Sequence, residues 1–169
     1  TATLYKKGAI AIRYPRGNAL GVPVGDFEQM QIGKGEVVRE GKDIAILAIG
    51  NMVYNSVNAA EILKEKGIDV EVVNMRFVKP LDAELLKSTF NKFKKVLTVE
   101  DNTILGGFGS AVSEFAEQYG YKNDILLHGL PDRFIEHRKP EELHADLKLD
   151  AKGIAEVTEE YFKKERVKI

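Results

Sequence analysis

Short apolar runs and helical apolar spacing alternate along most of this chain. The run at 44–49 is continuously apolar, which is typical of a central strand covered on both faces. From residue 108, apolar side chains recur at i, i+3, i+4, i+7, i+8 and i+11, as they do in an amphipathic helix. Comparable patterns predict strands at 36–39, 68–75, 95–101 and 124–130, and helices at 51–66, 80–90, 108–119, from 140 onward and at 150–162. This alternation predicts βαβ units, and therefore an α/β three-layer sandwich: a mostly parallel mixed sheet of about five strands with helices on both faces, in a single domain over residues 1–169.

Local signals place the ends of several helices. Asn51 and Asp150 are predicted N-caps, because their side-chain oxygens can accept the free amides of a first helical turn. Pro80 is predicted to open a short helix. Gly67 and Gly120 are predicted to end the helices that precede them.

The first part of the chain is predicted to add two further features to the sheet. Residues 36–49 read as a hairpin, with a Glu-Gly turn between two strands, so the sheet should contain antiparallel pairing. Residues 9–14, "AIAIRY", alternate with period two and are stopped by Pro15, which predicts another strand. Arg13 would lie on this strand and Arg16 just beyond it. Two fixed positive charges there can bind a phosphate or a carboxylate. The two arginines can equally lie at a solvated strand end and form one surface ion pair. Their spacing alone does not distinguish between these two interpretations.

The glycine loop "ILGGFGSAV" follows a predicted strand and opens a helix. Gly107 and Gly109 begin a dinucleotide-type fingerprint, but Val112 occupies the third glycine position. We therefore expect these glycines to permit a tight turn and close packing of the helix on the sheet. Glu100 and Asp101 end the preceding strand and point to opposite faces, so they are expected to cap the following loop and not to act as an acid/base pair. His128 is predicted to be a partly buried, hydrogen-bonded histidine.

Composition narrows the chemistry further. The chain has no cysteine and three scattered histidines, which argues against disulfides, thiolate nucleophiles and zinc sites. A net charge of −1 gives no basic field for nucleic acid, and no apolar run is long enough for a membrane span. A cytoplasmic location is expected, since nothing at the start resembles a signal peptide. No nucleophile–base constellation can be named, so the residues alone predict an α/β domain with one candidate anion site.

Several motifs in order resemble a known family. These are "RYPRGNALG", "NMRFVKPLD", "TVEDNTILGGFGSAV", "GLPDRFIEH" and "LKLD", and together they span about Gly8 to Phe162. They are similar to the C-terminal domain of the 1-deoxy-D-xylulose-5-phosphate synthases, within the transketolase group of thiamine-diphosphate enzymes. The first two motifs are fairly specific to the synthases, and the others fit transketolase C-terminal domains in general.

The resemblance implies a function shared with a longer polypeptide. The family's enzyme joins pyruvate to glyceraldehyde 3-phosphate, using thiamine diphosphate and magnesium, to give 1-deoxy-D-xylulose 5-phosphate and CO2. It implies that Arg16 contacts the acceptor's phosphate, with Arg13 and Tyr14 as supporting neighbours. The family's GDG…N cofactor motif is absent here. The chain is therefore expected to be about the last quarter of the enzyme, to bind no cofactor by itself, and to work with N-terminal and middle domains and a second subunit of a homodimer.

Two other functions remain open at this point. The domain can belong to a transketolase or close the β-subunit of a 2-oxoacid dehydrogenase, although β-subunits usually lack the arginine pair. It can also be a free-standing interaction module without catalytic activity.

Overall fold

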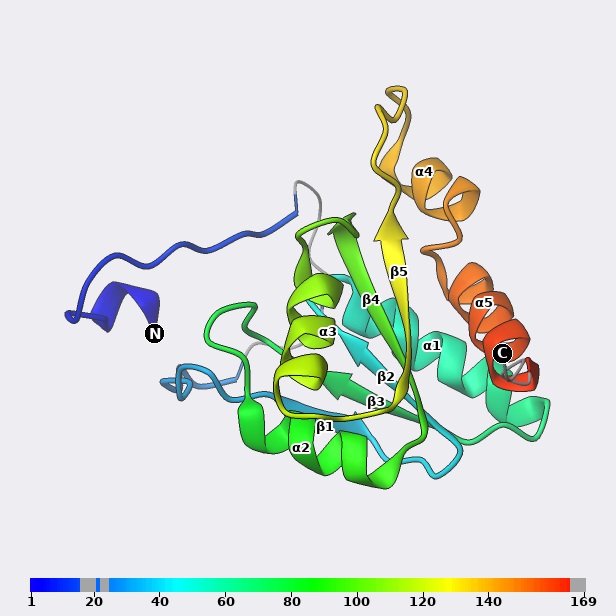
Figure 1. Cartoon of the computed structure of the whole chain (residues 1–169). Coiled ribbons are helices and arrows are strands. Elements are labelled where there is room, and N and C mark those ends of the chain that lie inside the picture. Colours follow the sequence, from blue (N-terminus) through cyan, green and yellow to red (C-terminus); the bar gives the residue numbers. More distant parts are fainter. Residues whose placement is uncertain (16–20, 22–24, 165–169) are drawn as a thin grey trace.

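The computed structural model describes residues 1–15, 21 and 25–164, and within them it confirms the predicted α/β architecture. A five-stranded sheet lies between two layers of helices (Figure 1). In chain order the elements are a 3-10 turn η1 (Ala2–Leu4), β1 (Glu36–Arg39), β2 (Ile44–Ala48), α1 (Met52–Glu65), β3 (Val70–Asn74), α2 (Ala83–Lys92), β4 (Lys95–Thr103), α3 (Phe108–Gln118), β5 (Asp124–Leu130), α4 (Pro140–Asp146) and α5 (Ala151–Lys163).

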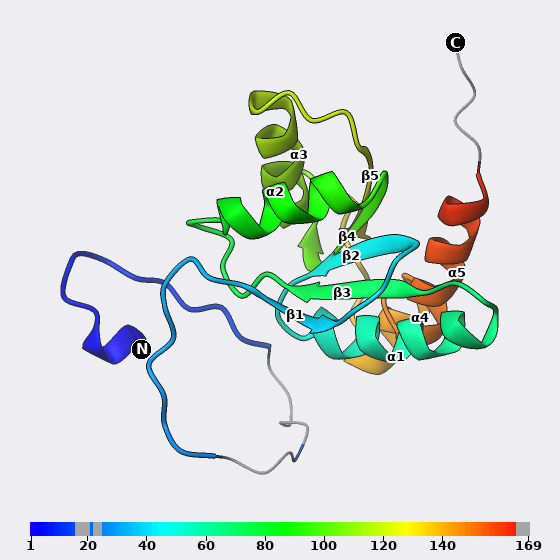
Figure 2. The ribbon, with the colours of Figure 1, turned by 90° about the horizontal axis from the view of Figure 1, so that it is seen from below.

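The sheet has the order β1-β3-β2-β4-β5. Strand β2 is parallel to both β3 and β4, and β4 is parallel to β5, whereas β1 runs antiparallel to β3. Helices α2 and α3 cover one face, and α1, α4 and α5 lie on the other (Figure 2). All five residues of β2 are buried, as its continuous apolar run predicts for a central strand.

The two faces of the sheet carry separate hydrophobic cores. Alternate residues of the same strand divide between them, so Ile46 packs with α1 and α5 while Leu47 packs with α2 and α3. Phe108 is the largest fully buried side chain of the second core and fixes the start of α3 against the sheet. Both cores together hold the carboxyl ends of β2 and β4 in fixed positions.

The predicted hairpin at 36–49 is wrong. Strands β1 and β2 both pair with β3, on its two opposite sides, and do not pair with each other. The connection crosses the start of β3 so closely that a Cβ atom on Gly41 would lie 2.2 Å from the backbone nitrogen of Glu71. The predicted antiparallel pairing in a mixed sheet is confirmed. However, β1 pairs with β3, which is separated from it by about thirty residues, and a local sequence pattern does not reveal such a partner.

The predicted strand at 9–14 is also wrong. These residues are extended but pair with no strand in the described part of the chain, and the segment runs outside the sheet (Figure 1). Ile12 is 66% exposed and Tyr14 is 81% exposed. Alternation of apolar and polar residues gives a segment one apolar face. A β-strand also needs an adjacent strand to pair with its backbone N–H and C=O groups. Arg13 is therefore not a strand residue.

Most predicted helix ends are confirmed. Gly67 and Gly120 adopt positive φ angles directly after α1 and α3, and Asp150 caps α5 by accepting the amide of Gly153 at 2.8 Å. Pro80 does not open a helix: α2 begins at Ala83, because Asp82 provides the N-cap.

Candidate functional site

Three elements bring polar side chains together at the carboxyl edge of the sheet. Asp101 belongs to β4, Asn51 precedes α1 directly after β2, and His144 lies on α4. Asn51 Nδ2 donates to Asp101 Oδ2 at 3.1 Å, and His144 Nε2 lies 3.6 Å from Asp101 Oδ1. Asn51 is at the predicted N-cap position but makes no capping hydrogen bond, because its side chain turns to Asp101. Ligand sites of parallel sheets form at this edge.

Arg13, predicted to support the phosphate contact of Arg16, reaches this cluster. Arg13 Nη2 donates to the backbone oxygen of Asp101 at 2.6 Å. Tyr14 is highly exposed beside it, and Arg16 lies outside the described residues. The structure therefore joins Arg13 to Asp101, two residues that no local sequence pattern connects.

The charges of this cluster reinforce one another. The neighbouring imidazole of His144 holds the pKa of Asp101 below its ordinary value, with help from Asn51 and from the charge of Arg13, against the opposing effect of burial. The neighbouring carboxylate of Asp101 likewise raises the pKa of His144, again against burial. Sequence reasoning missed His144, because its position on a helix forty residues away gives no local sign of the contact. For Asn51 there was a signal, since it follows the end of a buried strand.

Glu100 has a different role from its neighbour Asp101. Its carboxylate is buried and accepts the amides of Phe108 and Gly109, at 2.7 and 2.8 Å, at the start of α3. A Cβ atom on Gly107 would lie 2.4 Å from Glu100 Oε2, and one on Gly109 would lie 2.6 Å from Thr98 Oγ1. The predicted structural role of these glycines and the capping role of Glu100 are confirmed. The carboxylate takes the place that a nucleotide's phosphate would occupy at such a helix start.

His128 is hydrogen-bonded and partly buried, as predicted. Its Nε2 lies 2.7 Å from the backbone oxygen of Lys148. Burial lowers the pKa of His128, so the neutral imidazole is favoured. It ties β5 to the turn before α5 and takes no part in the Asp101 cluster.

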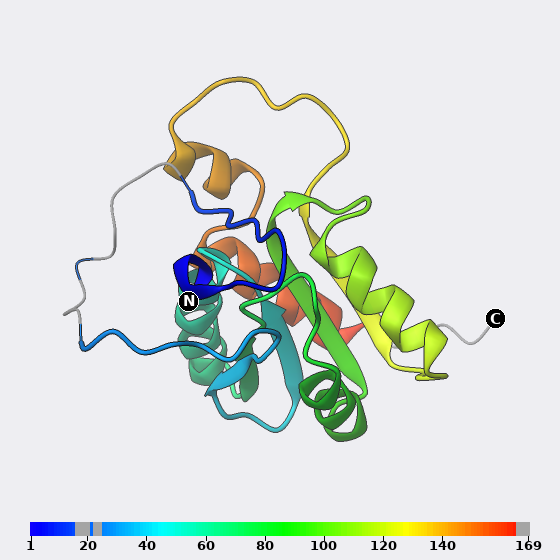
Figure 3. The same ribbon diagram turned by 90° about the vertical axis from the view of Figure 1, so that its left-hand side faces the viewer.

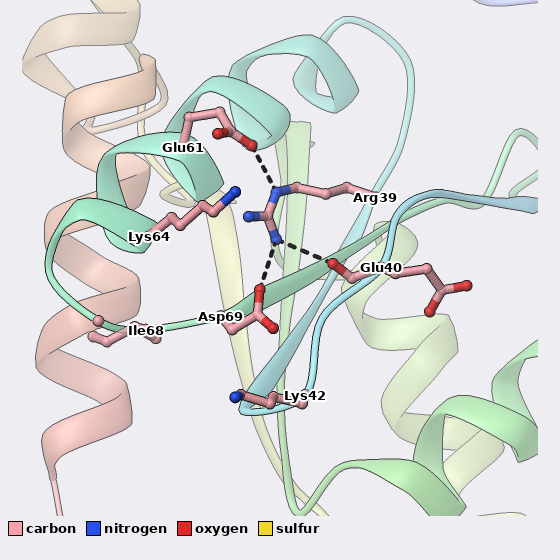
Figure 4. A pocket seen from close by; sticks show the side chains of 8 residues that line it. Arg39, Glu40, Lys42, Glu61, Lys64, Ile68 and Asp69 are labelled. Carbon is pink, nitrogen blue, oxygen red and sulfur yellow. Dashed lines mark hydrogen bonds and ion pairs between the residues drawn. The ribbon is translucent and has the colours of Figure 1, made fainter.

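A hollow of about 590 Å³ lies at the opposite edge of the sheet, where β3 begins (Figure 4). Its central cation, Arg39, is already bound: Nε donates to Glu61 at 2.8 Å, and Nη1 donates to Asp69 at 3.2 Å and to the backbone oxygen of Val70 at 2.5 Å. These bonds raise the pKa of Arg39, although burial opposes them. The bonds of Arg39 fasten β1 to α1 and to the start of β3.

The sheet order and the antiparallel first strand are those of a transketolase C-terminal type of domain. The family "Transketolase, C-terminal domain" matches residues 33–154, and the chain belongs to this family. Among solved structures, a split-gene transketolase described as an inactive beta4 tetramer aligns with a TM-score of 0.76 and 32% identity, covering 86% of this chain and 48% of that chain. A transketolase from Pichia stipitis, at 22% identity and a TM-score of 0.60, covers 80% of this chain and 19% of its own and supports the fold alone.

More specific similarity is found among the 1-deoxy-D-xylulose-5-phosphate synthases. The enzyme of Trichormus variabilis is 45% identical over 168 residues, which cover 98% of this chain and 26% of that protein. The Synechococcus sp. JA-3-3Ab enzyme is 49% identical over 158 residues, covering 92% and 24%. The Aquifex aeolicus enzyme is 45% identical over 160 residues, covering 95% and 26%. The chain thus spans about a quarter of the length of the relatives that it matches. Among the described residues, no helix has the length and apolar character needed to cross a bilayer.

Proposed function

We propose that this chain is the C-terminal domain of a 1-deoxy-D-xylulose-5-phosphate synthase. The observation that carries the proposal is 45–49% identity to such synthases along nearly the whole chain. The complete enzyme condenses pyruvate with glyceraldehyde 3-phosphate and releases CO2. This domain contributes a contact to the acceptor's phosphate and contributes to the stability of a cytoplasmic homodimer.

The cofactors belong to other parts of the complete enzyme. Thiamine diphosphate, with Mg²⁺, would supply the carbon nucleophile of the reaction. In this domain the helix start best suited to a diphosphate is that of α3, and its amides are already bound by Glu100. This occupation supports the assignment of the diphosphate to another part of the complete enzyme.

The acceptor's phosphate is assigned to the arginine segment. Arg16 makes the direct contact, because a guanidinium can bind phosphate through two parallel charged hydrogen bonds. Arg13 and Tyr14 support it. The anchoring of Arg13 at the carboxyl edge is in keeping with this assignment, since Arg16 follows only three residues later.

The test is steady-state kinetics of the complete enzyme with Arg16→Ala, comparing glyceraldehyde 3-phosphate with unphosphorylated glyceraldehyde. A charged contact of roughly 1.5–3 kcal/mol predicts a loss of about ten- to a hundredfold in kcat/KM for the phosphorylated acceptor alone. Lys122→Ala is the control, because Lys122 is a highly exposed cation on the loop after α3. An equal loss on both acceptors, or none, would contradict the phosphate assignment.

A second measurement tests whether this domain can catalyse the reaction without the other domains of the enzyme. The 169-residue chain alone, supplied with both substrates, thiamine diphosphate and magnesium, is expected to show no turnover. Product formation by the pure chain would contradict the assignment of the cofactors to other domains.

A further inference from the structure

We propose that residues 9–14 form a β-strand of another domain of the complete enzyme, joined to the edge of that domain's sheet. The inference goes beyond the proposed function, because it assigns an interface between domains and not a contact with substrate. It rests on the proposed function in one respect, that the chain is part of a longer enzyme, and it makes no use of the phosphate assignment. The partner that this segment fits is an open sheet edge beside an apolar core.

The backbone of residues 9–14 has the length and the side-chain alternation of a strand but no partner. The segment "AIAIRY" matches the common strand length of about 5–6 residues. In the described part of the chain, no backbone hydrogen bond joins it to another segment. Strand β1 has only four residues and still pairs with β3. An alternating segment with free N–H and C=O groups is suited to pair with the edge of another sheet.

The large apolar side chains of this segment lie on one side of it and are open to water. Successive side chains of an extended segment point to opposite sides, so Ile10, Ile12 and Tyr14 share one side. They are 40%, 66% and 81% exposed, respectively. Exposed apolar side chains that adjoin one another are typical of a contact with another protein surface. We therefore assign this side of the segment to the core of the partner domain.

Arg13 lies on the opposite side of the segment and faces the domain described here. Its Nη2 donates to the backbone oxygen of Asp101 at 2.6 Å, near the carboxyl end of β4. Ala9 and Ala11 share this side, and their small side chains permit close approach of the two domains. The contact also holds the segment away from the free edges of its own sheet, because β4 is already paired on both sides, with β2 and β5. The strand therefore has to find its neighbour in another sheet.

The similarity to the synthases indicates where that sheet lies. The family match begins at residue 33, so residues 9–14 lie outside the C-terminal domain that it defines. The similarity to the Trichormus variabilis synthase nevertheless covers 98% of this chain, and only 26% of that protein. The segment is thus shared with the synthases without being part of their C-terminal domain. Both facts favour a sheet in the remaining part of the same enzyme over a second copy of this chain.

Hydrogen–deuterium exchange of the complete enzyme, with the 169-residue chain beside it, tests the strand directly. In the complete enzyme, at least the alternate amides of residues 9–14 that pair with the partner should exchange about a hundredfold more slowly than in the chain alone. The amides of β2, which is buried and paired on both sides, should be protected in both proteins and show that the chain is folded. The measurement uses no substitution, so it does not depend on the folding of a variant.

Thiol labelling tests which side of the strand is buried. The chain has no cysteine, so Ile12→Cys introduces a thiol whose reaction with a maleimide can be followed in its own peptide by mass spectrometry. This thiol should react roughly tenfold or more slowly in the complete enzyme than in the chain alone, because the partner's core covers it. Lys122→Cys is the matched control: Lys122 is 79% exposed, at the opposite edge of the sheet, and the thiol of this variant should react at the same rate in both proteins.

Protection of residues 9–14 in the complete enzyme alone, with slow labelling of the Ile12→Cys thiol, supports the proposal. Equal exchange of residues 9–14 in both proteins overturns it. Protection already present in the 169-residue chain also overturns it: at every concentration it means pairing within this domain, and only at high concentration it means pairing with a second copy. Slow labelling without protected amides means packing without a strand, and fast labelling with protected amides means that the apolar side is not buried; both overturn it. None of these measurements uses the acceptor, so the kinetics of Arg16→Ala test the proposed function separately.

Discussion

The carboxylate of Glu100 accepts the backbone amide of Gly109 at 2.8 Å, inside the protein and away from water. The other carboxylate oxygen accepts the amide of Phe108, so one side chain satisfies two of the free donors at the start of α3. The negative charge also lies at the positive end of the helix dipole. The glycine loop between β4 and α3 resembles a nucleotide-binding loop in sequence. Here its amides are bound by Glu100, so the loop connects the strand to the helix and has a structural role.

Replacing this acid should weaken the fold substantially. Glu100→Gln can offer an acceptor oxygen to only one of the two amides and sets its own N–H groups against the other, so we expect a loss of about 2 kcal/mol in the free energy of unfolding. Urea denaturation of the 169-residue chain measures it. Glu114→Gln, at an exposed position on the same helix, is the control and should change stability little. Equal stability of the two variants would show that Glu100 does not secure α3.

Asp82 offers a test of a second cap, with a defined pH dependence. It accepts from Leu85, Gly35 and Lys34. Although burial acts in the opposite direction, these bonds hold the pKa of Asp82 below its ordinary value of 3.8. Its stabilisation is therefore present above about pH 4 and is lost as pH falls through the lowered pKa.

Asp82→Ala should cost about 1–2 kcal/mol at neutral pH, and the difference from wild type should shrink as the solution is acidified toward pH 2. Unfolding curves across that range measure it. Asp132→Ala, at an exposed position, should remain close to wild type at every pH. A deficit for Asp82→Ala that stays constant with pH would contradict the ionic contribution.

Most of the sheet could be predicted from the sequence, because its inner strands have a clear local hydrophobic pattern. Strand β2 is apolar at every position, and α3 has an unbroken helical stripe, so burial and periodicity agree for both. The errors arose where structure depends on a distant partner. Residues 9–14 have the alternation of a strand but pair with no strand among the described residues, and β1 pairs with β3, which the local pattern does not indicate.

The candidate site was less predictable than the fold for the same reason. Arg13 and Asp101 were both recognised as noteworthy residues, but their contact joins positions 88 apart in sequence. His144 joins the cluster from a separate helix, through a loop that arches away from the sheet before α4 (Figure 3). Only the three-dimensional arrangement shows that these residues act on one another.

The pair of Lys92 and Glu71 provides a test of a nearly buried charge. Glu71 is 3% exposed, and burial raises its pKa, with a further rise from the neighbouring Glu40 and against the opposing effect of Lys92. Lys92→Met should leave the carboxylate without its ammonium partner and cost about 1–2 kcal/mol, less than for a fully buried pair because Lys92 is partly exposed. Adding Glu71→Gln should recover most of that loss. Urea denaturation of both single variants and the double variant measures it, and additive losses would contradict the coupling.

His144 and Asp101 should make the stability of the chain depend on pH near neutrality. The ion pair with Asp101 raises the pKa of His144, so the stabilisation from this pair is complete below the ordinary value of 6.5 and is lost as pH rises through the raised pKa. The free-energy difference between wild type and His144→Gln should accordingly be larger at about pH 6 than at about pH 9, by up to about 1 kcal/mol. His137→Gln, at an exposed position, is the control and should show no such trend. Because Asp101 remains ionised throughout this range, its own lowered pKa adds nothing to the change. A difference for His144→Gln that is the same at both pH values would mean that the imidazole stays neutral beside Asp101 and holds α4 by packing alone.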